Sequence, residues 1–330
     1  MSLNAGRRAM EARGCSEASI RRFEDAYKKW QSCESETVDL AQFSSIQNDD
    51  ILDFESTQRT QADEQRLESL VVLKLNGGLG TSMGCQGPKS LIPVRNETSF
   101  LDYIIQSQEA MSLDLTLLNS FYTNEDTQGY LAKHGSKVQI QSLVQDQFPR
   151  IDIDTGAPVP DLDTTDSGWS PPGHGNIYSV LKESGTLDTW IQAGKEWVFI
   201  SNSDNIAAQV DLGILNTLAN SDTRFLMEVT PKTSADKKGG ILVRDADGRI
   251  QLVEIADVDP KDHEQFQDTN RFSYFNTNNL WVHLPTLKSL VESDSLTMRW
   301  IFNHKTVQGY SVLQFEQAMG TAIQCFPNAK

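Results

Sequence analysis

A glycine-rich segment constrains this chain more than any other feature. It follows a short apolar run at residues 71–75, places five glycines between Gly77 and Gly87, and closes with Pro88-Lys89. Glycine has no Cβ, so such a loop can wrap closely around a ligand and point backbone N–H groups at it. Lysine adds a point charge that suits a phosphate. The segment therefore predicts a nucleotide-phosphate site at the end of a buried strand.

Two common phosphate-binding motifs do not match this segment. A P-loop needs an adjacent Gly-Lys followed by Ser or Thr, whereas Pro88 separates Gly87 from Lys89. A dinucleotide fingerprint needs G-x-G-x-x-G, and the spacing from Gly78 through Gly80 to Gly84 is one residue too long. The structural alternative is a strand-to-helix turn that binds nothing.

From residue 71 onward, strand-like and helix-like patterns alternate. Apolar, β-rich runs recur at residues 113–118, 138–144, 197–201 and 225–229. Helical patterns lie between them at residues 100–110 and 177–190. This alternation predicts an α/β fold with a Rossmann-like open sheet, mixed but mostly parallel, flanked by helices. Ligands of such folds bind at the carboxyl ends of strands, where we expect both the glycine-rich segment and Asp204.

The N-terminal part of the sequence has a different character. Four apolar residues, Ile20, Phe23, Tyr27 and Trp30, follow one another at three- and four-residue spacings. They predict an amphipathic helix over residues 16–31. A polar stretch follows it. We therefore expect residues 1–70 to form an N-terminal helical extension that packs on a main domain at residues 71–330. A regulatory or oligomerisation role is the alternative, and the oligomeric state stays open.

Acidic residues outnumber basic ones, with 45 Asp and Glu against 29 Lys and Arg and a net charge of −16. This balance argues against nucleic acid or an anionic membrane as a partner, because either needs a basic face. Positive charge for phosphates must therefore be local. The candidate lysines are Lys74, Lys89, Lys232, Lys237 and Lys238.

The four cysteines are scattered along the chain, and no C-x-x-C pair occurs among them. The sequence also has no apolar signal region at its start and no long apolar run. Free thiols are typical of proteins in reducing compartments, so we expect a cytoplasmic location.

The segment L-N-G-G-L-G-T-x-M-G-x-x-G-P-K-S resembles the signature loop of nucleotidyltransferases that make nucleoside-diphosphate sugars, above all the eukaryotic-type UDP-glucose pyrophosphorylases. Other motifs that resemble this family follow in the order it requires. They are Q-D-Q-F-P-R-I at 145–151, P-P-G-H-G at 171–175, S-N-S-D-N at 201–205, M-E-V-T-P-K at 227–232, K-G-G at 238–240, E-I-A at 254–256, F-N-T-N-N-L-W at 275–281 and E-Q-A-M-G at 316–320. Several unrelated motifs in register argue against chance agreement.

The resemblance implies a nucleotide-diphosphosugar transferase fold, with residues 71–330 as the catalytic domain. The implied reaction converts UTP and glucose 1-phosphate to UDP-glucose and pyrophosphate, so the expected partners are these small molecules. The sugar phosphate is already anionic near neutral pH, so its oxygen needs no general base for in-line attack on the α-phosphate. Catalysis then depends on positioning and on charge stabilisation by backbone N–H groups, lysines and a Mg²⁺ cofactor.

The resemblance also implies a nucleotide-binding set. Leu75, Gly77 and Gly78 would lie against uracil and ribose, and Gly173 would close over the base. Gln145 would recognise the uracil edge with its amide, because uracil presents both an acceptor and a donor. Capping of a strand end is the structural alternative for Gln145.

Catalytic roles follow in the same way for three residues. Lys89 would hold the triphosphate, Lys238 would approach the sugar phosphate, and Asp204 would bind Mg²⁺ with a hard carboxylate oxygen. His174 would contact the phosphate or the sugar. Asp204 could instead simply form a turn, and His174 could be an exposed loop residue.

On the sugar side, the resemblance implies that Glu254, Asn276 and Asn278 hydrogen-bond glucose hydroxyls. Asn276 and Asn278 alternate along a predicted strand, so their side chains should share one face. Hydrogen bonding along a strand edge is the alternative for both.

The chain departs from the family pattern at several points. Asn176 stands at an acidic position, Gln86 stands where a basic residue is common, and residues 205–208 read N-I-A-A rather than N-L-G-A. The family continues with a segment like V-P-R-S-R-F-x-P-V-K, whose lysine serves the phosphates, and a C-terminal β-helical domain. The sequence stops at Lys330 without either one, and whether it is a shortened or a natural short form stays open.

Two other functions remain open at this point. One is a UTP or UDP-glucose binding protein with weakened catalysis. Two features suggest it, namely Asn176 and the lack of the family's second phosphate-binding lysine. The other is a pyrophosphorylase for a different UDP-sugar. N-acetylhexosamine enzymes usually carry G-T-R in the glycine-rich loop, whereas this chain has Gly80-Thr81-Ser82.

Overall fold

Strand β2 (Leu70–Asn76) lies at the centre of the sheet, and all but one of its side chains are buried. It pairs in parallel with β5 (Leu115–Asn119) on one side and with β10 (Trp197–Asn202) on the other. β6 (Ile140–Val144) continues the parallel sheet beyond β5. Continuous apolar runs such as β2 are typical of inner parallel strands, which are buried on both faces. The computed structural model describes residues 2–32, 37–57, 63–80, 84, 87–160, 166–233, 235–237 and 239–330.

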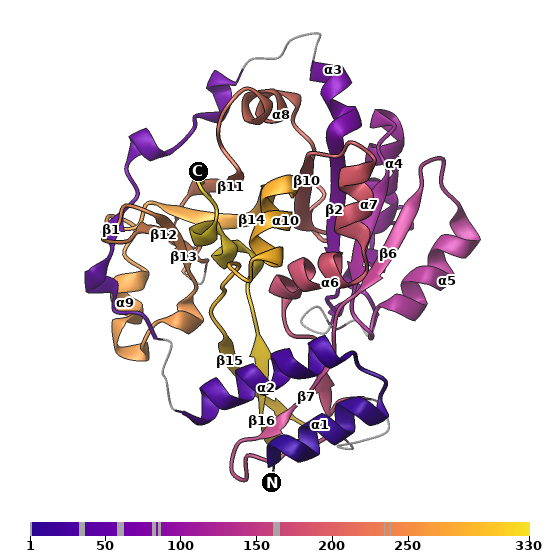
Figure 1. Ribbon diagram of the computed structural model, residues 1–330. Helices are drawn as coiled ribbons and strands as arrows, with labels where there is room; N and C mark the ends of the chain where they lie inside the picture. The colour runs from indigo at the N-terminus through magenta and orange to yellow at the C-terminus, as the bar shows by residue number, and fades with distance from the viewer. Residues whose placement is uncertain are drawn as a thin grey trace.

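The strand order reverses next to β2. The chain passes from β2 through β5 to β6 in one direction and then returns to the opposite side of β2 with β10 (Figure 1). In open α/β sheets, ligands bind at the carboxyl ends of strands where the order reverses in this way. The glycine-rich segment begins at the end of β2, and Asp204 follows the end of β10, so both flank this point.

Antiparallel strands extend the sheet beyond β10. The extending strands are β14 (Tyr274–His283), β11 (Phe225–Pro231), β12 (Ile241–Arg244), β13 (Ile250–Val253) and β1 (Ser44–Ser45). β14 pairs with β10, both β11 and β12 pair with β14, and β12 also pairs with β13 and β1. Over the described part of the chain, the result is a mixed sheet of nine strands.

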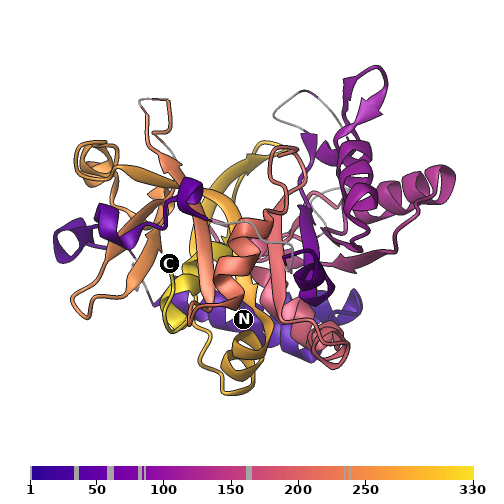
Figure 2. The same ribbon diagram turned by 90° about the horizontal axis from the view of Figure 1, so that it is seen from above.

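Helices cover both faces of this sheet (Figures 1 and 2). One face carries α6 (Ile177–Glu183), α7 (Thr186–Gln192) and α10 (Leu284–Glu292), and the other carries α4 (Phe100–Met111) and α8 (Leu212–Ala219). Val71 and Leu73 of β2 pack in the first layer, whereas Leu70 and Val72 pack in the second. Alternate side chains of a strand point to opposite faces, so β2 contributes to both cores.

Two N-terminal helices, α1 (Ser2–Ala12) and α2 (Glu17–Gln31), pack together on smaller strands at one end of the molecule (Figure 1). These strands are β15 (Ile301–Val307), β16 (Tyr310–Glu316), β8 (Ile151–Asp152), β7 (Phe148–Pro149) and β9 (Trp169–Ser170). Phe23 of α2 is fully buried, with its ring centroid 5.6 Å from that of Phe148 and 5.8 Å from that of Phe315. An aromatic cluster therefore attaches the extension to the rest of the fold.

The remaining elements are short or peripheral. They are α3 (Asp63–Arg66), α5 (Asn124–His134), α9 (His263–Phe266), the hairpin strands β3 (Pro93–Arg95) and β4 (Thr98–Ser99), and 3₁₀ turns at Leu40–Gln42, Asn48–Asp50, Phe54–Ser56, Leu67–Ser69, Lys89–Leu91, His174–Asn176, Ile255–Asp257, Pro260–Asp262 and Met319–Cys325. In the described ranges, every helix is too short or too polar to cross a lipid bilayer.

The predicted α/β class, open mixed sheet and flanking helices are confirmed. The expected amphipathic helix is α2, which begins after the capping residue Ser16. One element differs from its prediction, because the helix expected over 177–190 is divided into α6 and α7. Gly185 adopts a left-handed φ of +72° between them and ends the first helix.

Replacing Phe23 with alanine should lower the free energy of unfolding by about 3–5 kcal/mol, because a fully buried aromatic ring leaves a cavity. Urea denaturation would measure this loss. The matched control is Phe54→Ala, because the Phe54 side chain is 58% exposed and should cost less than about 0.5 kcal/mol. An equal loss in both variants would contradict this account of the aromatic cluster.

Candidate functional site

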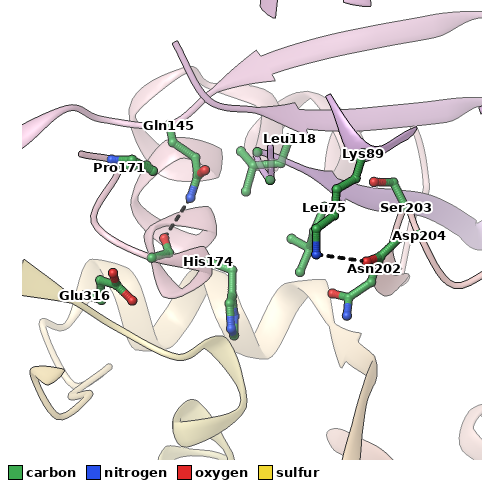
Figure 3. A pocket seen from close by; sticks show the side chains of 13 residues that line it. Leu75, Lys89, Leu118, Gln145, Pro171, His174, Asn202, Ser203, Asp204 and Glu316 are labelled. Carbon is green, nitrogen blue, oxygen red and sulfur yellow. Dashed lines mark hydrogen bonds and ion pairs between the residues drawn. The ribbon is translucent and has the colours of Figure 1, made fainter. Parts of the chain in front are cut away.

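A cleft of about 270 Å³ opens at the carboxyl ends of β2 and β10 (Figure 3). The predicted site residues that line it are Leu75, Gly77, Gly78, Lys89, Gln145, Gly173, His174 and Asp204. Further lining residues with no role assigned from the sequence are Leu118, Pro171, Asn202, Ser203 and Glu316. The fold thus brings together segments that lie far apart along the chain.

The two ends of the glycine-rich segment are held together by backbone hydrogen bonds. The N–H of Lys89 donates to the carbonyl of Gly78 over 3.0 Å, and the N–H of Gly80 donates to that of Gly87 over 2.9 Å. This closure places Lys89 beside the glycines although it lies ten positions after Leu79 in the sequence. Residues 81–83, 85 and 86 lie outside the described part of the loop.

A lysine and a carboxylate face each other at one end of the cleft. Lys89 Nζ lies 3.3 Å from Asp204 Oδ2, and about a third of each side chain is exposed. Ion pairs this open to water contribute about 0–1 kcal/mol, so an incoming ligand can separate them at little cost. The backbone N–H of Ser203 donates to the carbonyl of Leu75 over 3.1 Å and holds the Asp204 turn against β2.

The opposite end of the cleft carries an amide between two glycines. Gln145 Nε2 donates to the carbonyl of Gly173 over 2.7 Å, as Figure 3 shows. Its Oε1 lies only 2.4 Å from where a Cβ on Gly77 would stand, so residue 77 must be glycine for this approach. Three predicted nucleotide-binding residues from different segments therefore meet.

His174 has a defined protonation pattern. Its Nδ1 accepts a hydrogen bond from the backbone N–H of Met319 over 3.0 Å, so the ring proton of the neutral form lies on Nε2. Burial lowers the pKa of His174 to about 4. Near neutral pH the ring is therefore an uncharged donor at the wall of the cleft.

The loop that holds Gly173 packs tightly against the chain after β16. Gly173 has a left-handed φ of +76°, and a Cβ there would stand 2.5 Å from the carbonyl oxygen of Gln317. Glu316 reaches the cleft from the same segment, and burial raises the pKa of its carboxyl group. The sequence motif E-Q-A-M-G contained this residue, but only the tertiary contact indicates that it reaches the cleft.

The predicted sugar-side residues stand beyond the cleft lining. Asn278 Nδ2 donates to Oδ1 of Asn202, which does line the cleft, over 2.9 Å. Asn276 Oδ1 accepts the backbone N–H of Asn278 over 2.7 Å. The Glu254 carboxyl group packs against Gly240, and burial together with the nearby Asp257 raises its pKa to about 7.

The regular strand that was assumed for Asn276 and Asn278 is interrupted between them. The register of β14 against β11 shifts between Asn276 and Asn279, and Asn278 adopts a left-handed φ of 64°. Asparagine tolerates this conformation better than most residues. Thr277 helps to hold the irregularity, because its Oγ1 donates to the carbonyl of Glu228 over 2.7 Å.

Three candidate phosphate lysines lie outside the lining of the cleft. Lys74 is buried, donates to Ser201 Oγ and the carbonyl of Ala208, and has a pKa lowered to about 8 by burial. Lys232 is also buried and donates to a backbone carbonyl over 3.0 Å. Lys237 is exposed in another part of the molecule. Lys238, predicted to be catalytic, lies outside the described residues.

Comparisons with known proteins identify related sequences and structures. A family model described as UTP–glucose-1-phosphate uridylyltransferase matches residues 20–330. The Pyrus pyrifolia enzyme of that name is 45% identical over 308 residues, which cover 90% of this chain. The chain spans 65% of the length of that relative, which is less than two thirds.

Solved structures resemble the whole chain. A UDP-glucose phosphorylase from Trypanosoma brucei has a TM-score of 0.91 at 32% identity and covers 100% of this chain and 74% of its own. A single-residue mutant of UDP-glucose pyrophosphorylase from Leishmania major, in complex with UDP-glucose, has a TM-score of 0.89 at 33% identity. It covers 99% of this chain and 74% of its own length.

The lowered pKa of His174 predicts a dependence of stability on pH. An unfolded His titrates near pH 6.5, whereas the folded ring stays neutral down to about pH 4, so the unfolded state binds more protons between these values. Stability from the neutral ring is therefore complete above pH 6.5 and declines by up to about 1.4 kcal/mol per pH unit as pH falls.

Urea denaturation at pH 7 and pH 5 would measure this decline. His174→Asn should reduce the loss of stability on acidification, whereas His304→Asn, at an exposed position of β15, should not. The same pH dependence in wild type and His174→Asn would refute the assignment.

Proposed function

Because this chain belongs to the UTP–glucose-1-phosphate uridylyltransferase family, we propose that it transfers the uridylyl group of UTP to glucose 1-phosphate. The products would be UDP-glucose and pyrophosphate. The observation that carries this proposal is the division of the cleft into two unlike ends. Gln145 and its two glycines form one end, and the Lys89–Asp204 pair forms the other.

The first end suits a nucleobase. An amide offers both a donor and an acceptor, which matches the edge of uracil. Leu75 and Leu118 add apolar surface beside it, and glycines allow a flat ring to approach the backbone. We therefore assign uracil and ribose to Leu75, Gly77, Gly78, Gln145 and Gly173.

The second end suits phosphates. Lys89 would leave Asp204 and turn to the triphosphate, because a polyphosphate offers it more negative charge than one carboxylate does. An oxygen of glucose 1-phosphate would attack the α-phosphorus of UTP while the bond from that phosphorus to the bridging oxygen breaks. Pyrophosphate then departs with the electron pair of that bond, and positioning and electrostatics account for the rate.

A Mg²⁺ cofactor fits this end of the cleft. Protein sites for Mg²⁺ supply one or two carboxylates and leave the other positions to phosphate oxygens and water. Asp204 would be the protein ligand, because its carboxylate lines the cleft beside Lys89. In the described ranges, no three His, Cys, Asp or Glu residues gather around a common point, so substrate oxygens would complete the coordination. When bound, Mg²⁺ would neutralise charge on the phosphates.

In this proposal, the residues that recognise the sugar come from segments next to the cleft, together with His174 of its lining. Asn276, Asn278 and Glu254 would bind glucose hydroxyls, and His174 would donate from Nε2 to the phosphate or the sugar. We also propose Lys238 as a second cation near the sugar phosphate, on the family motif alone.

The domain division and location are proposals of the same kind. We assign residues 71–330 to the catalytic domain and residues 1–70 to an N-terminal extension, a division that rests on the change in sequence pattern at residue 71. The free thiols Cys15 and Cys325 favour a reducing compartment and therefore the cytoplasm.

A binding protein without efficient turnover is the second candidate. One observation favours it, namely that Lys89 is the single lysine among the described residues that line the cleft. Such a protein should bind UDP-glucose and raise its own melting temperature without releasing pyrophosphate.

Pyrophosphate release from UTP, glucose 1-phosphate and Mg²⁺ tests the proposed reaction. Removing a preorganised cation from such a site costs roughly 3–4 kcal/mol in the transition state, so Lys89→Ala should lower kcat by about 10²–10³-fold. Lys133→Ala is the matched control, because Lys133 is exposed on α5 and does not line the cleft. N-acetylglucosamine 1-phosphate should react more slowly than glucose 1-phosphate.

The absence of turnover at high enzyme concentration would refute the transferase proposal. A rise in melting temperature with UDP-glucose would then support the binding protein instead. If UDP-glucose also gave no rise, neither function would stand.

Gly77→Ala should separate nucleotide binding from stability. The new Cβ would meet the end of the Gln145 side chain at 2.4 Å, and that amide can move aside without unfolding the protein. We expect UTP affinity to fall about tenfold, the loss of about one good hydrogen bond, with little change in melting temperature. Gly129→Ala, where a Cβ meets nothing within 4 Å, should leave affinity unchanged. Unchanged UTP affinity in Gly77→Ala would place the base elsewhere.

A further inference from the structure

The N-terminal helices hold the chain segment that directly follows Gln145. Three successive residues of that segment each contact a different residue of the extension. Arg22 Nη2 lies 2.6 Å from Asp146 Oδ2, Arg13 Nε lies 2.7 Å from Gln147 Oε1, and the Phe23 ring centroid lies 5.6 Å from that of Phe148. The segment that follows Gln145 is therefore anchored to α2 and to the turn before it.

Asp146 also connects this segment to the other loop on the base side of the cleft. Its Oδ2 accepts from Asn176 Nδ2 over 2.7 Å, and its backbone N–H donates to Asn176 Oδ1 over 2.8 Å. Asn176 follows the Gly173-His174-Gly175 loop. One carboxylate thus joins α2 to both loops that carry predicted base-binding residues.

The two hydrogen bonds between Asp146 and Asn176 explain why residue 176 is an asparagine in this chain. Asparagine offers the donor and the acceptor that Asp146 uses, whereas an aspartate would place a second carboxylate against the first. The resembled family motif carries an acidic residue at this position. In this chain the negative charge stands on Asp146 instead, and Arg22 lies against it.

Arg22 bridges two carboxylates with its fork of donors. One arm reaches Asp146, and the other reaches Glu183 at the end of α6. The side chains of Arg22 and Asp146 are 22% and 15% exposed, so the pair is better sheltered than an ordinary surface ion pair. Arg21, next to it, is 74% exposed and pairs only loosely with Glu17 at 3.5 Å.

We propose that Arg22 is a positioning residue for the nucleotide site: through Asp146 and Asn176 it holds the Gln145 and Gly173 loops at the spacing that a uracil nucleotide requires. The N-terminal extension is then part of the binding apparatus. This inference rests on the proposed function, because it assigns the base end of the same cleft.

Calorimetric titration of the full chain with UDP-glucose tests the inference independently of turnover. Arg22→Ala should weaken binding about tenfold, because a sheltered charge-assisted contact is lost. The KM for UTP should rise by a similar factor while kcat changes less than about twofold, since Arg22 touches no reacting group. Arg22→Lys should bind UDP-glucose more tightly than Arg22→Ala and more weakly than wild type. Lysine keeps the positive charge but cannot bridge both carboxylates as the guanidinium group does. Arg21→Ala is the matched control and should bind as wild type does.

Asp146→Asn removes the negative charge from the other partner of the Arg22–Asp146 contact and preserves the shape of the side chain. It should weaken binding, and the double variant should lose less than the sum of the two single losses, because both substitutions remove the Arg22–Asp146 contact. Should Arg22→Ala fail to fold, Asp146→Asn and Arg22→Lys carry the test.

The outcomes separate the inference from the function it rests on. Wild-type affinity in folded Arg22→Ala, or additive effects of the two substitutions, would overturn the positioning role and leave only an anchor for α2. A wild-type protein that binds neither UDP-glucose nor UTP would overturn the proposed function itself.

Discussion

The buried amide of Asn76 joins the carboxyl ends of three parallel strands, and the arrangement of the cleft depends on it. Its Nδ2 donates to Asn119 Oδ1 over 2.8 Å at the end of β5, and its Oδ1 accepts from Ser203 Oγ over 3.3 Å after β10. Thr123 Oγ1 donates to the backbone carbonyl of Asn76 over 2.7 Å. A buried amide is stable only when its hydrogen bonds are satisfied, so these contacts specify the relative position of the strand ends. The glycine-rich segment starts at the next residue.

From that point, the site is built by close approaches between loops. The absence of a Cβ at Gly77 allows the close approach of Gln145, and its absence at Gly173 allows that of Gln317. The backbone hydrogen bond between Gly78 and Lys89 holds Lys89 near the end of β2. None of these loops is positioned by its own secondary structure. Their geometry depends on neighbours in other parts of the chain, and one such neighbour is Arg22 of α2, which contacts Asp146 beside Gln145.

The success of sequence-based prediction varied with the kind of feature. Strands, the amphipathic helix α2 and the meeting of the glycine-rich segment with Asp204 followed from apolar periodicity and the rules of open sheets. Lys74 was one of five candidate phosphate lysines, but its side chain is buried and its ammonium group is hydrogen-bonded to Ser201 and Ala208. The residues at 277 and 278 disrupt a regular strand because register depends on the partner strand.

The sequence by itself determined the order of strands and helices and the glycine-rich segment, because burial periodicity and glycine stereochemistry are local properties of a chain. Its motifs indicated the family by their resemblance to it. Tertiary structure alone decided that Lys89 rather than Lys74 faces the cleft, that Glu316 lines it, and that Arg22 reaches Asp146. These outcomes depend on which residues, more than a hundred positions apart in the last case, become neighbours on folding. Burial, ion pairing and hydrogen-bond satisfaction are properties of such neighbourhoods and not of any one segment.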